Sequence, residues 1–239
     1  MTYSHLQGAI QWTFIFHGIC GALALSLFAV PMLAKKGGKT HVRVGWIYTG
    51  LMVLVCVSAF AITPWRAFSD PQRTPSSQAF ALFLFFISVL TLSSLSFGIT
   101  ALRAKKRTLP SQSPLHLGPV FALIASAIAV EVWGLKDQET LLIVFPVLGI
   151  YVAWKQLLYW KSAPTEKMHW WYAHMSGLFT ACIATITAFI VTVVPRFWPS
   201  DIAHSPVLWV APGLILGKIL SKLTANYRDQ FKDTAPAKA

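Results

Sequence analysis

Seven long apolar segments constrain the fold of this 239-residue chain more than any other feature. They cover residues 11–34, 44–64, 79–102, 116–135, 140–160, 169–194 and 205–222. Each is close to the roughly 20 mostly apolar residues that a helix needs to cross a bilayer. Only 12% of the residues are charged, about half the share that is usual in a soluble domain. The sequence therefore predicts an all-α integral membrane bundle of seven transmembrane helices.

The basic residues predict how this bundle is oriented. Sixteen of the twenty lysines and arginines lie in residues 35–43, 103–107, 155–167 and 218–238. The other four are Arg66, Arg73, Lys136 and Arg196, which lie on the opposite side of the predicted bundle. Cytoplasmic loops carry the excess of lysine and arginine, so we expect the N-terminus outside and the C-terminus in the cytoplasm. Because the basic residues lie at the ends of apolar segments, the net charge of +12 indicates a partner in the lipid bilayer rather than nucleic acid. We therefore expect a multi-pass protein of the bacterial inner membrane.

The chain has no long polar linker that would separate two domains. We expect a single transmembrane domain over residues 1–225 and a flexible cytoplasmic tail over residues 226–239, because the tail is polar and has no apolar periodicity. Three prolines inside the segments, Pro119, Pro146 and Pro212, are expected to kink or loosen their helices.

Two ionisable residues lie inside the outer half of the predicted bundle. An ionisable side chain in lipid is costly and is often functional. His17 lies about two turns into the first segment, and Glu131 is the only carboxylate within any segment. One hypothesis is an outward-facing polar ligand pocket formed by His17 and Glu131, with His204 as another partner for His17. The alternatives are an interhelical hydrogen bond for His17 and an interfacial role for Glu131.

Three histidines are expected at one depth, near the cytoplasmic ends of their helices. His41 begins the second segment, His116 begins the fourth, and His174 lies in the sixth. Neutral imidazole binds haem iron and other transition metals, so His41 or His116 paired with His174 could bind a cofactor such as haem b or a transition metal. The alternative is that each is an interfacial residue, like the neighbouring Trp170 and Trp171.

Motifs that would assign a reaction are missing from the sequence. It contains no G-x-S-x-G, H-E-x-x-H, phosphate loop or C-x-x-C-H. Its three cysteines lie within apolar segments and lack the spacing of zinc ligands. No residue is therefore predicted to be catalytic.

Two stretches resemble the domain-of-unknown-function 2306 family of bacterial membrane proteins. They are HGICGALALSLFAVPMLAKKGGKTHVRVGWIYTGLMVLV and HWWYAHMSGLFTACIATITAFIV. The resemblance is sharpest at His17 and in the pattern His41-x-x-x-Gly45-x-x-Tyr48, but Val42 follows His41 where the family pattern has an arginine. It implies a polytopic membrane fold and no particular reaction. The chain is also loosely similar to small histidine-bearing membrane proteins that assist terminal oxidases. By analogy, this similarity implies a role in handling haem or copper.

Three functions remain open from the sequence. The first is a redox or oxidase-assembly protein that binds haem or a metal through its histidines. The second is a small-molecule transporter or ligand-binding protein, with flexible proline-containing helices around His17 and Glu131. The third is a non-catalytic subunit of a larger membrane complex.

Overall fold

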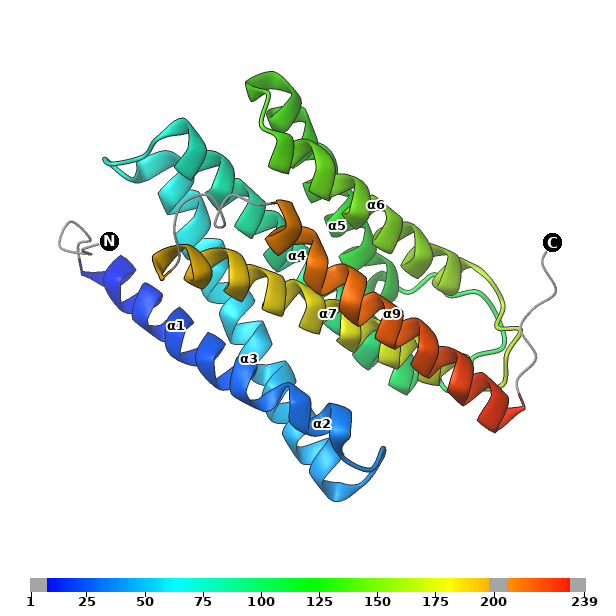
Figure 1. Ribbon diagram of the computed structural model, residues 1–239. Coiled ribbons are helices and arrows are strands. Elements are labelled where there is room, and N and C mark those ends of the chain that lie inside the picture. The colour runs from blue at the N-terminus through cyan, green and yellow to red at the C-terminus, as the bar shows by residue number, and fades with distance from the viewer. Residues whose placement is uncertain (1–7, 198–205, 233–239) are drawn as a thin grey trace. The chain divides into compact units, whose positions relative to one another are not determined.

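The computed structural model describes residues 8–197 and 206–232, and this part of the chain is helical with no β-strand (Figure 1). In chain order the elements are α1 (Ala9–Leu27), α2 (Ala29–Leu33), α3 (Lys39–Pro64), the π-helix η2 (Trp65–Ser69), α4 (Pro75–Arg103), α5 (Pro114–Asp137), α6 (Thr140–Lys161), α7 (His169–Val193), the 3-10 helix η3 (Val194–Arg196) and α9 (Pro206–Phe231). The prediction of an all-α fold is confirmed.

Within the described residues, seven helical spans are long and apolar enough to cross a membrane. They are Ala9–Leu33, Lys39–Ser69, Pro75–Arg103, Pro114–Asp137, Thr140–Lys161, His169–Arg196 and Leu208–Phe231. The predicted number of transmembrane helices is therefore confirmed. The last helix continues through Phe231, into the segment that the sequence assigned to the tail, and residues 233–239 lie outside the described part.

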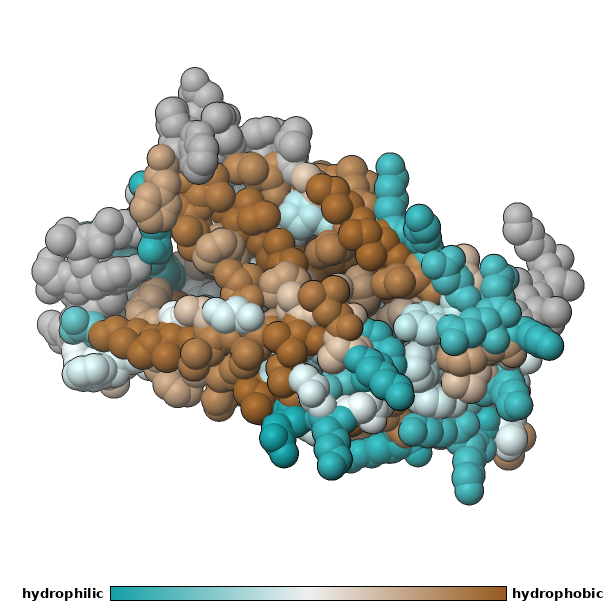
Figure 2. All heavy atoms as spheres, turned by 60° about the horizontal axis from the view of Figure 1, so that its bottom comes forward, coloured by the Kyte–Doolittle hydropathy of each residue, from teal (hydrophilic) through white to brown (hydrophobic). Residues whose placement is uncertain are grey.

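On the face drawn in Figure 2, hydrophobic side chains cover the middle of the molecule. Large apolar side chains such as Ile19, Val57, Val132 and Leu214 are more than half exposed. Contiguous apolar surface of this extent would be unfavourable in water. Along helices of this length it matches the hydrocarbon core of a bilayer, so the structure has the surface of a multi-pass membrane protein.

The chain forms two compact units, which are described separately. Unit 1 is Met1–Leu92 with Ser126–Pro146. In it α1 lies along α3, and aromatic pairs such as Phe83–Phe145, whose ring centroids are 5.0 Å apart, fill the interior. The first span is interrupted between α1 and α2 at Phe28. Pro31 explains this break, because a proline has no N–H to donate to the carbonyl four residues earlier and its ring crowds that carbonyl.

Unit 2 is Ser93–Ala125 with Val147–Ala239. The C-terminal half of α4 meets α7 at two glycines, Gly98 and Gly177. A Cβ atom placed on Gly177 would lie 2.6 Å from the carbonyl oxygen of Ser94 and 2.7 Å from the backbone nitrogen of Gly98. Small residues allow helices in a membrane to approach this closely. On another side α7 packs against α9, so α7 is the central helix of this unit's packing.

Candidate functional site

His41 lies at the start of α3 and binds the end of the preceding helix. Its Nδ1 lies 2.9 Å from the carbonyl oxygen of Pro31, and because a carbonyl only accepts, Nδ1 is the donor. Lys36 donates to the carbonyls of Pro31 and Met32. Burial lowers the pKa of the Lys36 ammonium. The two side chains satisfy carbonyls that the end of α2 leaves without an intrahelical partner, which gives His41 a structural role.

His17 makes the interhelical hydrogen bond that its depth suggested, with partners on α3. Its Nδ1 lies 3.1 Å from the carbonyl oxygen of Val55 and 2.9 Å from the hydroxyl oxygen of Ser58. Glu131 is half-buried on α5 and forms no ion pair within the described residues. His204 lies outside the described part. The His17–Glu131 pocket stays a prediction.

His116 and His174 both belong to unit 2 and use Nδ1 in different contacts. The ring of His116 stacks on Trp160 with centroids 3.8 Å apart, and its Nδ1 is 2.6 Å from the Ser111 hydroxyl oxygen. The Nδ1 of His174 lies 3.1 Å from the carbonyl oxygen of Gly98. Among the described residues no three His, Cys, Asp or Glu side chains gather in an arrangement that could hold a metal ion. Binding of haem or a metal by His41, His116 and His174 stays a prediction.

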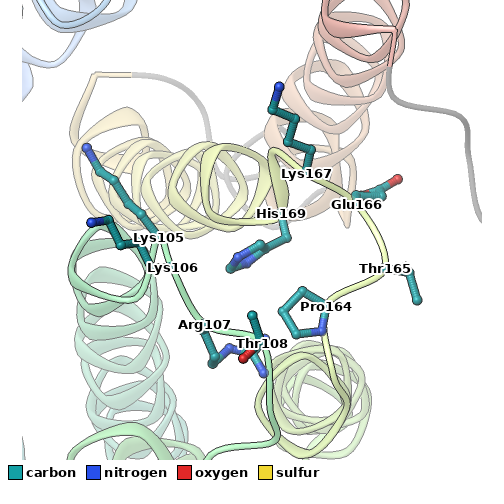
Figure 3. Close-up of a pocket in the computed structure, with 9 residues that line it drawn as sticks. All are labelled: Lys105, Lys106, Arg107, Thr108, Pro164, Thr165, Glu166, Lys167 and His169. Carbon is teal, nitrogen blue, oxygen red and sulfur yellow. The ribbon is translucent and has the colours of Figure 1, made fainter.

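A different site lies at one end of unit 2, between two loops. The loop from α4 to α5 contributes residues 105–108, the loop from α6 to α7 contributes residues 164–167, and His169 begins α7. Together they line a cavity of about 440 Å³, called here the basic pocket. In Figure 3 the ring of His169 projects into the space between the loops, whereas the lysines extend outward around it.

Arg107 joins the two loops of the basic pocket. Its guanidinium donates to the carbonyl oxygens of Leu109, Ser162 and Tyr159 at 3.0, 2.7 and 2.8 Å. The last two carbonyls lie at the C-terminal end of α6, where a helix has unpaired carbonyls and partial negative charge. The guanidinium also lies over the Tyr159 ring, 4.7 Å from its centroid. Arg107 thus caps α6 and fixes the loop that follows α4.

Three nitrogen atoms around Tyr159 are buried without a hydrogen bond of ordinary geometry to the described residues: Arg107 Nε, Trp160 Nε1 and His169 Nε2. His169 is 8% exposed and Trp160 is 0% exposed. The Tyr159 hydroxyl lies 2.9 Å from His169 Nδ1, and the His169 ring also interacts with the backbone of Lys105. In the tautomer in which Tyr159 donates to Nδ1, Nε2 carries the proton. All three atoms are then donors, and acceptor groups interact with two of the side chains: the Lys105 backbone with the His169 ring and the Tyr159 side chain with Arg107.

The charge of the pocket wall is strongly positive. It includes Lys105, Lys106, Arg107 and Lys167, and within residues 8–197 and 206–232 its single carboxylate is Glu166. Glu166 is bound by Arg228 of α9, with 2.8 Å between Nε and Oε1. Arg107 contacts carbonyl groups and aromatic rings, and Lys105 lies over the Trp170 ring, 4.4 Å from its centroid. Among the described residues, the only carboxylate beside the cations of the wall is that of Glu166, and Arg228 already pairs with it. The positive charge of the wall is therefore not neutralised.

The sequence contained two signals for this pocket, and each had another explanation. The run Arg103–Arg107 predicted membrane orientation, and residues 169–172 were interpreted as an aromatic belt. Neither pattern shows that Arg107 meets Tyr159, which is 52 residues away along the chain. The site is therefore visible only in the folded chain.

Comparisons with protein-family models, with curated proteins and with solved structures give no match to this chain.

Proposed function

We propose that this protein is a ligand-binding membrane protein whose basic pocket takes a phosphate-bearing anion. The observation that carries the proposal is the positive wall of the pocket: it carries Lys105, Lys106, Arg107 and Lys167, and the carboxylate of Glu166 among them is already paired with Arg228. A ligand with ionised acceptor oxygens would complement this charge, and hydrogen bonds to an ionised acceptor are about twice as strong as neutral ones.

Phosphate fits the site better than a singly charged anion does. The wall carries four cations and one carboxylate that is already paired with Arg228, so the site favours an anion with more than one negative charge. A phosphate monoester carries between one and two negative charges at pH 7 and has three terminal acceptor oxygens. Lysine binds phosphate as a point charge, and arginine and histidine add directional hydrogen bonds.

The position of the pocket favours a ligand at the membrane surface. It lies where the spans Pro75–Arg103 and Thr140–Lys161 end and where His169–Arg196 begins, which is the level of lipid headgroups. If the predicted orientation holds, this end faces the cytoplasm, where anionic lipids attract basic side chains by roughly 1 kcal/mol per lysine or arginine. The phosphate could belong to a lipid headgroup or to a soluble phosphate ester, and the experiment below separates these sources.

Binding of phosphate should depend on the lysines of the pocket. In the variant K105A/K106A we expect the dissociation constant to rise about 30-fold, since each of the two lysines near a membrane surface contributes roughly 1 kcal/mol and every 1.4 kcal/mol changes the constant about tenfold. The purified protein would be titrated with glycerol 3-phosphate and, in a second arm, reconstituted in nanodiscs with phosphatidic acid or with phosphatidylcholine alone. Binding of glycerol 3-phosphate indicates that a soluble phosphate ester is sufficient, whereas binding of phosphatidic acid alone indicates a lipid headgroup.

The matched control is K39A/R43A, which removes two exposed basic residues near the start of α3 in unit 1. It should leave the dissociation constant unchanged. An equal loss in both double variants would mean that general surface charge attracts the anion. Absence of phosphate binding to the unsubstituted protein would overturn the proposal.

Haem or metal binding is the second candidate. It is favoured by the Nδ1 contact of His174 with the carbonyl oxygen of Gly98, because a histidine ligand commonly donates to a carbonyl through one ring nitrogen. His174 and His116, which belong to the same unit, would hold the group. Purified protein should then show a Soret band, or contain metal, and H174A should abolish the signal while H204A retains it. Protein that lacks both signals after expression with added haem and copper would overturn this candidate.

A further inference from the structure

The carboxylate of Glu166 occupies a special position in the basic pocket. Among the described residues it is the only acidic group on the wall, and its side chain is only 11% exposed. A carboxylate at this place is an anion already tethered to the site. Unless another group neutralises it, it would bind the cations of the wall itself and exclude an incoming phosphate.

Arg228 is the group that neutralises Glu166, and it comes from a different part of unit 2. Its Nε lies 2.8 Å from Oε1 and its terminal nitrogen lies 3.4 Å from Oε2. Arg228 is on α9 and does not line the pocket. It therefore holds the carboxylate from outside the site, through both oxygens.

Several contacts place this end of α9 against the start of α7. The Arg228 guanidinium lies over the Tyr172 ring, 5.1 Å from its centroid. Next to it, Trp171 packs edge-on against Tyr227 and Phe231, with ring centroids 5.3 and 5.4 Å away. The same first turn of α7 also carries His169, which lines the pocket. A movement of the α9 end would therefore act on a segment that forms part of the pocket wall.

We propose that Arg228 sets the affinity of the basic pocket for phosphate by binding Glu166, so that the C-terminal end of α9 regulates the site. This inference rests on the proposed function. When Arg228 holds the carboxylate, the lysines of the pocket wall are available to the ligand. When α9 moves away or Arg228 is replaced by a neutral residue, Glu166 competes with the ligand for the same cations. Binding and α9 position are then coupled, and such couplings change affinity by factors of roughly 5 to 150.

The test is a double-mutant cycle on Arg228 and Glu166, measured as phosphatidic acid binding in nanodiscs. We expect R228A to weaken binding about tenfold, E166Q to match or exceed the affinity of the unsubstituted protein, and R228A/E166Q to bind like E166Q. Rescue by the second substitution is the decisive result, because a merely structural role of Arg228 would not be corrected by neutralising Glu166. K222A removes another positive charge from α9 and should leave binding unchanged.

Each other result counts against the inference. Equal binding by R228A and the unsubstituted protein would overturn it, as would a double variant as weak as R228A. If R228A fails to fold, E166Q alone decides, because weaker binding by E166Q would show that the carboxylate assists the ligand. Failure of the unsubstituted protein to bind any phosphate monoester would instead overturn the proposed function, so the two failures are distinct.

Discussion

Replacing Gly177 by alanine should lower the free energy of unfolding by about 3 kcal/mol, the upper part of the usual range for overpacking. The added methyl group would lie 2.6 Å from the carbonyl oxygen of Ser94 and 2.7 Å from the backbone nitrogen of Gly98. Both are backbone atoms, so the clash cannot be relieved by turning a side chain. The helices α4 and α7 would have to move apart, and their packing would be lost along the contact.

Thermal unfolding in detergent, followed by circular dichroism, measures this effect. The control is G50A in α3, where an added Cβ would meet no atom within 4 Å. Alanine has a higher helix propensity than glycine by about 1 kcal/mol, so G50A should unfold at the same or a higher temperature. A G177A protein that is as stable as the unsubstituted one would show that α4 and α7 do not make this backbone contact in the membrane.

Replacing Arg107 by leucine should also lower the free energy of unfolding by about 3 kcal/mol, because a hydrogen bond from a charged donor contributes about 1.5–3 kcal/mol. The bond to Tyr159 is part-buried, and the two exposed bonds add less. The variant loses the contacts with the carbonyls of Leu109, Tyr159 and Ser162. It leaves the C-terminal end of α6 uncapped. R107K should restore little of this stability, because a lysine cannot reproduce the planar fork with which arginine reaches several acceptors.

The neighbouring residue provides the comparison for Arg107. Lys106 is exposed, so K106A should unfold within about 0.5 kcal/mol of the unsubstituted protein, although it should weaken phosphate binding. The same melting experiment measures both variants. If R107L and K106A are equally stable, Arg107 does not cap α6, and the description of how the two loops are joined would be wrong.

The sequence predicted the seven spans because hydropathy is a local property: each segment carries its own apolar residues. The end of the last helix was harder to predict. Residues 226–231 are polar on average, but Tyr227 and Phe231 pack on Trp171, and Arg228 pairs with Glu166. These tertiary contacts extend α9 where local composition indicated a tail.

The candidate site depended even more on tertiary contacts. The sequence offered His41 as a cofactor ligand or an interfacial residue, whereas the structure shows it in contact with the backbone carbonyl of Pro31, which no sequence motif marks. The basic pocket required three segments to meet: the loop after α4, the end of α6 and the start of α7. Sequence patterns describe each segment separately, so they found the basic run and the aromatic run without the site between them.

The cap that Arg107 places on α6 has an evolutionary consequence. The loop after α4 and the end of α6 share one set of hydrogen bonds: the Arg107 contacts and the bond of 2.7 Å from the Ser111 nitrogen to the Trp160 carbonyl. An insertion or deletion in one loop would displace the other, so natural variation should preserve the lengths of both loops together, even where the lipid-facing residues of the same helices drift freely.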